Sequence, residues 1–282
     1  MNELFQRKKF EDCEFDIVLL IGQSNAEGHG IGEVENEYLP SDDVMQLVDS
    51  YPVMYRINDT GAEVLDVPEN TTYRINTAAE STRRGFGKQG CFAFSFIRAY
   101  REKHLAGGDR KLLLIRAAIG GTGFLRNQWT PDGVLFKRAL EMTDIALSLN
   151  PNNRLGAILW HQGESEAIDA KGKDYAFHYG FYSECLTRLI NDLAAKYGNV
   201  PFLAGGYCED WTPRFPNESS AITDANKDVI SKFAHCGFVD TAGLGSNDRI
   251  VKGEYLDDVH FNRPALYELG ERYFEAYEKI TK

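Results

Sequence analysis

The sequence has no long apolar run, no cluster of positive charge and no paired-cysteine motif. No segment approaches the roughly 18 consecutive apolar residues of a membrane-spanning helix, so we expect no membrane partner. The longest group of basic residues is "QRKK" at residues 6–9, and the net charge is −11, from 31 basic and 42 acidic side chains. Because such a charge repels phosphate backbones, we also expect no nucleic-acid partner.

The sequence also lacks the motifs that are typical of disulfide frameworks, metal sites and cofactor sites. The five cysteines are odd in number, far apart and never arranged as CxxC, which predicts free thiols and a reducing compartment. No HExxH occurs, and four histidines lack a partner at metal-ligand spacing, so no metal site is predicted: His29, His104, His178 and His235. The glycines of "GHGIG" (28–32) have the wrong spacing for a dinucleotide site, and no cofactor is predicted.

The N-terminal segment "MNELFQRKKFEDCEFD" has charges on both sides of Phe10 and no apolar stretch typical of a secretory signal. Together with the free thiols, this segment predicts a cytoplasmic protein. The composition, 43% hydrophobic and 26% charged, is typical of a folded globular chain.

Short apolar runs alternate with amphipathic segments along the chain. The apolar runs predict strands buried on both faces, at residues 16–22, 111–120, 155–160, 200–207 and 236–240. The amphipathic segments predict helices at residues 91–105, 133–149, 181–197, 220–234 and 263–280, the last with Asn262 as its N-cap. This alternation indicates parallel βαβ units in a single α/β domain over residues 1–282, with a sheet of about five strands.

Residues 31–89 break this alternation and form a long loop and hairpin insertion. Within it, "VMYRINDTGAEVLDV" predicts a β-hairpin around Asp59, Thr60 and Gly61. We expect the insertion to lie over the carboxyl ends of the strands, where open parallel sheets bind ligands. The simpler alternative is a hairpin that only decorates an edge.

Four segments at strand-to-helix junctions carry unusual polar residues: "GQSN" (22–25), "GGTGF" (120–124), "WHQGESEA" (160–167) and "LDDVHFN" (256–262). Together they supply the groups that acyl transfer needs. Ser24 is a candidate nucleophile and His260 a candidate general base. The backbone N–H groups of Ser24 and Gly121 and the amide of Gln162 are candidate donors to an oxyanion. The simpler alternative for Ser24 is a helix cap.

Two aspartates precede His260 in "LDDVH". A short turn can fold the side chain at position i−3 back onto residue i, whereas an i−2 side chain in an extended stretch points along the same face. Asp257 is therefore predicted to hold the second ring nitrogen of His260, in preference to Asp258.

The four segments, in this order and spacing, resemble the SGNH-hydrolase superfamily, in the branch of sialate O-acetylesterase-like proteins and carbohydrate esterase family six. The segment "GKQGCFAFSF" (87–96) also resembles the part of that family that leads into its first helix. The resemblance spans residues 16–280. It implies a flavodoxin-like fold, which is a three-layer α/β/α sandwich.

The resemblance further implies a serine esterase that removes O-acetyl groups from a carbohydrate, such as an acetylated xylo-oligosaccharide or a sialic acid, without a cofactor. Ser24 would be the nucleophile, Asp257 and His260 would complete the triad, and Gly121 and Gln162 would line the oxyanion hole. Two other functions stay open: an esterase or thioesterase acting on a non-sugar acyl group, and a flavodoxin-like binding module without chemistry.

Several nearby residues are candidates for supporting or substrate-binding roles: Gln23, Asn25, His161 and Glu164. His161 could line the pocket or be packed in the core, and Glu164 could support its loop or contact a sugar hydroxyl. Three aromatic residues could stack on a sugar or belong to the core: Trp129, Tyr207 and Trp211. The string "GLGSND" (243–248) is interpreted as a loop, because no strand leads into it. The oligomeric state is not predicted.

Overall fold

A computed structural model describes residues 4–5, 7–33, 38–51, 53–57, 60, 63–68, 71–80, 90–250 and 257–282. Its centre is an eight-stranded sheet in the order β1-β6-β3-β7-β2-β8-β9-β10. The strands are β1 (Leu4–Phe5), β2 (Phe15–Gly22), β3 (Val44–Asp49), β6 (Tyr73–Thr77), β7 (Lys111–Arg116), β8 (Arg154–His161), β9 (Phe202–Gly205) and β10 (Cys236–Val239). All neighbours pair in parallel except β3 and β6.

The five strands predicted from apolar runs are confirmed as β2, β7, β8, β9 and β10. They stand in the order β7-β2-β8-β9-β10, which is the flavodoxin-like order 2-1-3-4-5 when they are numbered along the chain. Every residue of β2 is buried, because the strand has a neighbour on each edge and helices on each face. This burial explains why its sequence is a continuous apolar run.

The predicted number of about five strands was wrong, because β1, β3 and β6 extend the sheet beyond β7. Two of these strands, β3 and β6, come from residues 31–89, so this insertion is more than a loop and a hairpin. The sequence of β6 gives only a weak strand signal, because the strand is short and carries little apolar surface. In β6, "YRINT", only Tyr73 and Ile75 are buried.

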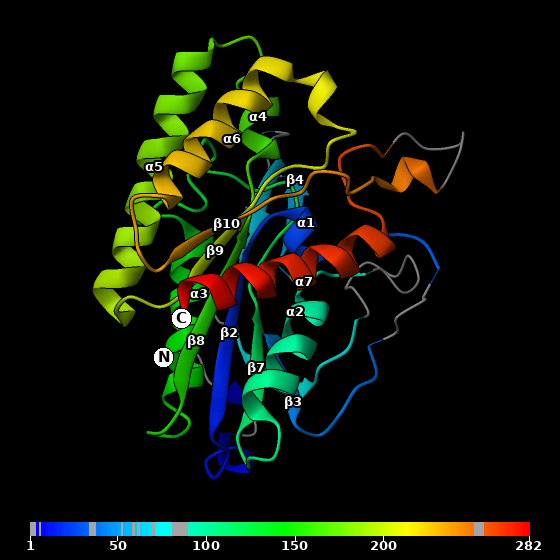
Figure 1. The fold of residues 1–282 in the computed structure, drawn as a ribbon. Helices are drawn as coiled ribbons and strands as arrows, with labels where there is room; N and C mark the ends of the chain where they lie inside the picture. Colours follow the sequence, from blue (N-terminus) through cyan, green and yellow to red (C-terminus); the bar gives the residue numbers. More distant parts are fainter. Residues whose placement is uncertain are drawn as a thin grey trace.

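Helices cover both faces of the sheet (Figure 1). On one face lie α2 (Ala93–Tyr100), which continues as a single π-helical segment at Arg101–Leu105, and α7 (Arg263–Ile280). On the other lie α3 (Val134–Leu147), α5 (Tyr175–Tyr197) and α6 (Pro216–Ile230), as right-handed crossovers require. Two short helices, α1 (Ser24–Glu27) and α4 (Glu164–Asp169), follow β2 and β8. The α/β/α sandwich is thus confirmed.

The helix ends follow their capping residues. The predicted cap of α7 is confirmed, since the Asn262 side chain accepts a hydrogen bond from the Ala265 N–H at 2.9 Å. Helix α5 begins at Tyr175, earlier than predicted, because Asp174 caps it by accepting from the Phe177 N–H at 2.8 Å. In the described part of the chain, no helix is long and apolar enough to cross a membrane.

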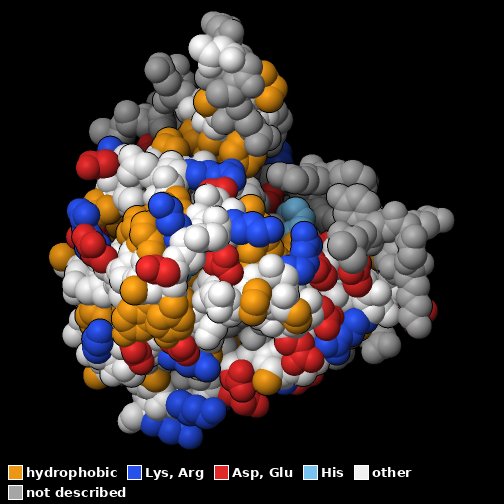
Figure 2. Space-filling view, turned by 90° about the horizontal axis from the view of Figure 1, so that it is seen from above, with side chains coloured by type: hydrophobic (Ala, Val, Ile, Leu, Met, Phe, Trp, Pro, Cys, Tyr) orange, Lys and Arg blue, Asp and Glu red, His pale blue; other side chains and the backbone are white. Residues whose placement is uncertain are grey.

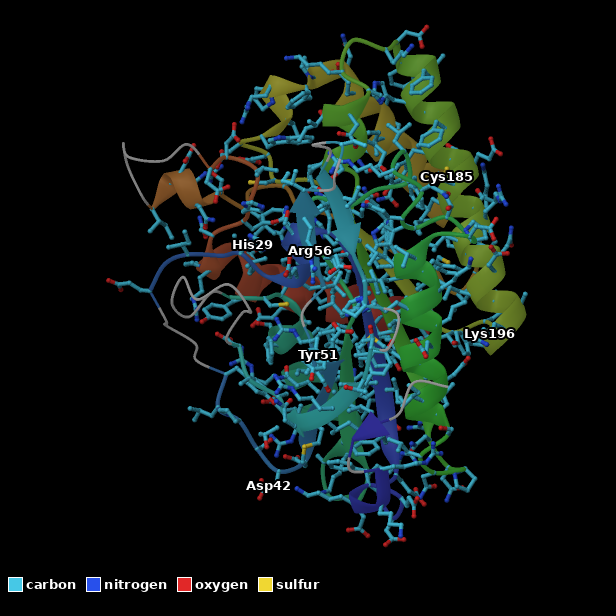
Figure 3. All side chains as sticks on the ribbon, turned by 180° about the vertical axis from the view of Figure 1, so that it is seen from behind. His29, Asp42, Tyr51, Arg56, Cys185 and Lys196 are labelled. Atoms are coloured by element: carbon cyan, nitrogen blue, oxygen red, sulfur yellow. The ribbon has the colours of Figure 1, made fainter. Side chains whose placement is uncertain are left out.

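The predicted hairpin is present as β4 (Met54–Ile57) paired antiparallel with β5 (Glu63–Asp66). Thr60 lies between the two strands, whereas Asp59 and Gly61 lie outside the described residues. In Figure 3, the label of Arg56 in the hairpin stands close to that of His29, which follows β2 in the chain. Asp42 lies at the opposite end of the sheet. The Tyr55 hydroxyl donates to the Gly121 carbonyl at 2.7 Å, so the hairpin contacts the carboxyl edge of the sheet.

Two helix glycines allow a matched test of how tightly α2 and α7 pack. A Cβ on Gly270 of α7 would overlap the Phe92 carbonyl and lie 2.7 Å from Ser95 Cβ, whereas a Cβ on Gly180 of α5 meets nothing within 4 Å. We expect Gly270→Ala to lower the free energy of unfolding by about 1–3 kcal/mol. Gly180→Ala should raise it by up to about 1 kcal/mol, because alanine favours a helix. Urea unfolding measures both, and equal effects would contradict the close approach.

Candidate active site

The loop after β2 presents Ser24 at the carboxyl edge of the sheet. Gly22 has a φ of +126°, and a Cβ on it would overlap the backbone of His161, so the end of β2 lies directly against the end of β8. The Gln23 N–H donates to the His161 carbonyl at 3.0 Å. Ser24 is the first residue of α1 and is 6% exposed. Among the described residues, nothing accepts a hydrogen bond from the Ser24 backbone N–H.

The Gln23 side chain joins this loop to the one that follows β8. Its Oε1 accepts hydrogen bonds from Gln162 Nε2 at 3.1 Å, from the Gly163 N–H at 3.3 Å and from the Ser165 N–H at 3.2 Å. Gln23 is 3% exposed, so these bonds are shielded from water. Gln23 therefore supports the structure between the two loops.

Asn25, on the other side of Ser24, joins α1 to the loop that carries His260. Its Nδ2 donates to the Val259 carbonyl at 3.0 Å, and its Oδ1 accepts from the Phe261 N–H at 3.1 Å. The same Nδ2 donates to Glu164 Oε1 at 2.7 Å. The residues on both sides of His260 are thus fixed to the residue that follows Ser24.

Asp257 is the aspartate that contacts His260. Its Oδ1 lies 2.7 Å from His260 Nδ1, and its Oδ2 accepts from Asn247 Nδ2 at 2.8 Å. Burial alone would raise the pKa of Asp257, but the hydrogen bonds from His260 and Asn247 hold it below its usual value. Asp258 instead accepts from Arg214 at 2.8 Å.

Asn247 is a part of the site that the sequence pattern did not reveal. It lies in the string "GLGSND", at the start of a short 3-10 helix (Asn247–Arg249). Besides its bond to Asp257, its Nδ2 donates to the His29 carbonyl at 3.0 Å, its Oδ1 accepts from the Ile31 N–H, and its N–H donates to the His260 carbonyl. Asn247 therefore holds the Asp257–His260 loop against the segment after α1.

The turn after β7 approaches Ser24 closely. A Cβ on Gly120 would lie 3.3 Å from Ser24 Cβ, and the Gly120 N–H donates to Glu27 Oε2 at 2.7 Å. Gly121 has a φ of +70°, and its carbonyl accepts from Tyr55 at 2.7 Å and from Arg126 at 2.9 Å. Its own N–H donates to nothing in the described part of the chain, like that of Ser24.

His29 is a second residue of this region that had no predicted role. Its ring lies 4.8 Å from the ring of His260, centroid to centroid, with 30° between the ring planes. Its Nε2 is 3.3 Å from Glu27 Oε2. His29 is therefore a neighbour of the candidate general base.

Gln162 is buried beneath the turn after β7. Its Nε2 lies against three acceptors, which are Gln23 Oε1 at 3.1 Å, the Thr122 carbonyl at 3.2 Å and the Glu166 carboxyl. Because this nitrogen carries two hydrogens, a developing oxyanion would have to compete for one of them. Burial raises the pKa of Glu166 to about 7.

The other candidate residues are buried. His161 is 1% exposed, its Nδ1 is 3.0 Å from the Tyr273 hydroxyl, and burial lowers its pKa to about 3. Glu164 is also 1% exposed, and its Oε1 accepts a hydrogen bond from Asn25 Nδ2 at 2.7 Å. Three aromatic residues are at most 7% exposed and pack in the core, so none presents an open face to a sugar: Trp129, Tyr207 and Trp211.

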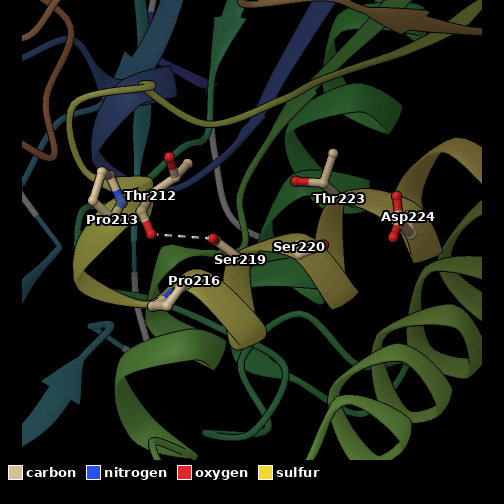
Figure 4. A pocket seen from close by; sticks show the side chains of 7 residues that line it. All are labelled: Thr212, Pro213, Pro216, Ser219, Ser220, Thr223 and Asp224. Atoms are coloured by element: carbon tan, nitrogen blue, oxygen red, sulfur yellow. Dashed lines mark hydrogen bonds between the residues drawn. The ribbon is translucent and has the colours of Figure 1, made fainter.

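On the face seen from above, acidic and basic side chains of the described residues are mixed (Figure 2). A hollow of about 350 Å³ lies at the start of α6, and no predicted site residue lines it (Figure 4). In the described ranges, no three His, Cys, Asp or Glu side chains are placed to hold a metal ion.

The fold and the sequence both match known proteins. The structure of NanS has a TM-score of 0.70 at 19% identity, covering 95% of this chain and 98% of that one. A structure from Arabidopsis thaliana has a TM-score of 0.68 at 18% identity, covering 94% and 98%. A curated relative from Escherichia coli (strain K12), a probable 9-O-acetyl-N-acetylneuraminic acid deacetylase, is 24% identical over 98 residues. That match spans 34% of this chain and 30% of the relative's length.

The fold is that of the SGNH hydrolases, as predicted. Residues 14–279 match the family described as carbohydrate esterase, sialic acid-specific acetylesterase. The chain belongs to this family, which confirms the resemblance carried by the four sequence segments.

The buried carboxyl of Glu164 predicts a specific pH dependence of stability. Burial raises its pKa from 4.5 to about 7, so between these values the folded protein keeps a proton that the unfolded chain releases. Its contribution to the free energy of unfolding therefore falls as the pH rises through this window, by at most about 1.4 kcal/mol per pH unit. Glu164→Gln, which stays neutral, should lose this fall in urea unfolding measured from pH 4.5 to 8.

A control for this measurement is Glu184→Gln, at an exposed position on α5. This variant should keep the pH dependence of the parent protein. The same slope in the Glu164→Gln variant and the parent would show that Glu164 is ionised in the folded protein throughout this range.

Proposed function

We propose that this protein is a serine esterase that removes O-acetyl groups from a carbohydrate, with Ser24 as the nucleophile, His260 as the general base and Asp257 orienting the imidazole. The observation that carries the proposal is the set of hydrogen bonds made by Asn25. These bonds hold the residue after Ser24 against the residues on both sides of His260. Membership of the carbohydrate esterase family supports the reaction class.

In this mechanism, Asp257 binds Nδ1 of His260 and leaves Nε2 to take the proton of the Ser24 hydroxyl. The Ser24 oxygen attacks the acetyl carbonyl, and the C=O oxygen becomes an oxyanion. The N–H groups of Ser24 and Gly121 donate to it, and Gln162 is the third donor. The C–O bond to the sugar then breaks, and the sugar oxygen takes the proton from His260. A water molecule, deprotonated by His260, attacks the acetyl-enzyme; acetate leaves, and His260 returns the proton to the Ser24 oxygen.

The substrate class follows from the family, and we propose an acetylated saccharide. The curated relative's name specifies a 9-O-acetylated sialic acid, so O-acetylated sialic acids are the first substrates to assay, followed by acetylated xylo-oligosaccharides. Acetate release from such a panel, with Ser24→Ala as the blank, is the direct test. A parent protein that releases no more acetate than the blank from any of them would contradict the proposal.

Two neighbouring aspartates allow a matched test of the triad. Asp257→Asn should lower kcat by up to roughly 10⁴-fold, because an amide at this position favours the wrong imidazole tautomer. Asp258→Asn should stay within a few-fold of the parent, because Asp258 contacts Arg214 and not His260. Steady-state acetate release measures both. If Asp258→Asn caused the larger loss, the triad assignment would be wrong.

The acyl group is tested with a series of 4-nitrophenyl esters. The acyl group of the proposed substrates is acetyl, and the backbone of Gly120 packs beside Ser24. We therefore expect kcat/KM to fall steeply from acetate to butyrate and activity to vanish at octanoate. A preference for octanoate would favour an esterase for lipid-like acyl groups.

A further inference from the structure

Glu166 is a buried carboxyl group that the proposed mechanism does not use. It lies in α4, within the segment "WHQGESEA", and is 1% exposed. A carboxyl group in such a place is costly unless its oxygens accept hydrogen bonds, so its contacts indicate why it is there.

The two oxygens of Glu166 contact two different parts of the candidate oxyanion hole. Oε1 accepts from the N–H groups of Phe124 and Leu125, in the turn that carries Gly121. Oε2 accepts from Nε2 of Gln162. A Cβ on Gly123 would lie 3.0 Å from the carboxyl carbon of Glu166, so this turn packs directly on the carboxyl group. One side chain therefore joins two of the three candidate oxyanion donors.

The hydrogens of Gln162 Nε2 show what this contact achieves. One hydrogen is held by the carboxyl group of Glu166, which is the strongest of the three acceptors when it is ionised. The other is shared between two neutral oxygens at longer distances, Gln23 Oε1 at 3.1 Å and the Thr122 carbonyl at 3.2 Å. A shared, weaker bond can be redirected to a developing negative charge, whereas the bond to Glu166 fixes the plane of the amide.

We infer that Glu166 is a positioning residue, which fixes the orientation of the Gln162 amide and holds it in register with the turn that carries Gly121. The catalytic consequence rests on the proposed function: one N–H of Gln162 stays available for the oxyanion. An amide in place of the carboxyl group could still accept from Phe124, but it would face Gln162 with a second NH₂ group. Two donors facing each other would allow the Gln162 amide to turn over and present its oxygen to the oxyanion.

The test is a double-mutant cycle between Glu166→Gln and Gln162→Ala. Gln162→Ala should lower kcat for 4-nitrophenyl acetate on the order of 10²–10³-fold. Glu166→Gln should lower kcat at least 10-fold, with KM within a few-fold of the parent. The double variant should be no worse than Gln162→Ala alone, because Glu166 acts through Gln162. Losses that multiply would overturn the inference.

The matched control is Glu164→Gln, which changes a neighbouring carboxyl group that is equally buried but contacts Asn25. Its loss of kcat should multiply with that of Gln162→Ala. If Glu166→Gln does not fold, Glu166→Asp takes its place in the cycle, because its shorter carboxylate retracts from Gln162.

A second measurement does not depend on activity. The side-chain amide signals of Gln162 in ¹⁵N NMR should move as the pH passes about 7, the pKa of Glu166, in the parent protein. The movement should become much smaller in Glu166→Gln, where only the more distant Glu164 still titrates in this range, and should persist at nearly full size in Glu164→Gln. The other titratable groups near this site are Tyr182, Cys185, Tyr207 and Glu164. A movement of undiminished size in Glu166→Gln would overturn the inference. A parent without turnover but with the expected signals would contradict only the proposed function.

Discussion

The two amide side chains beside Ser24 are the constraint on which the rest of the site depends. Gln23 accepts three hydrogen bonds from the loop after β8, and Asn25 makes three with Glu164 and the His260 loop. An amide suits position 25 because Asn25 donates and accepts at once, which neither a carboxylate nor a hydrocarbon can do. Since a serine lies between the two, the position of its backbone follows from contacts that its neighbours make.

Behind these amides lies a layer of buried titratable groups. Burial raises the pKa values of Glu164 and Glu166 to about 7 and lowers that of His161 to about 3. In all three groups, burial therefore favours the neutral form. Each contacts a group that belongs to the site or the sheet beneath it: Glu164 contacts Asn25, Glu166 contacts Gln162, and His161 contacts Tyr273. Such groups stabilise a fold poorly but specify one arrangement of hydrogen bonds.

The sequence predicted those parts of the structure that leave a local pattern. The strand β2 is a continuous apolar run because it is buried on both faces, and Asp257 faces His260 because a turn brings residue i−3 onto residue i. Strand β6, which is short and has only Tyr73 and Ile75 buried, had no such signal. Asn247 could not be found this way, because it bonds to the Ile31 N–H, 216 residues away, and nothing near either position encodes that contact. The contact of Tyr55 with Gly121 could not be predicted either, because the two residues are 66 positions apart in the sequence.

The divergence of Asp257 and Asp258 shows how the loops of the site are held. Asp257 turns inward to His260 and Asn247, and Asp258 binds Arg214, in the segment after β9. The His260 loop thus has separate attachments to α1, to the Asn247 segment and to Arg214. Because the sheet and its apolar core do not depend on these attachments, loss of one should misplace a reacting group by a fraction of an ångström and leave the fold intact. We therefore expect substitution of the residues that hold the loops to change the activity of the protein more than its stability.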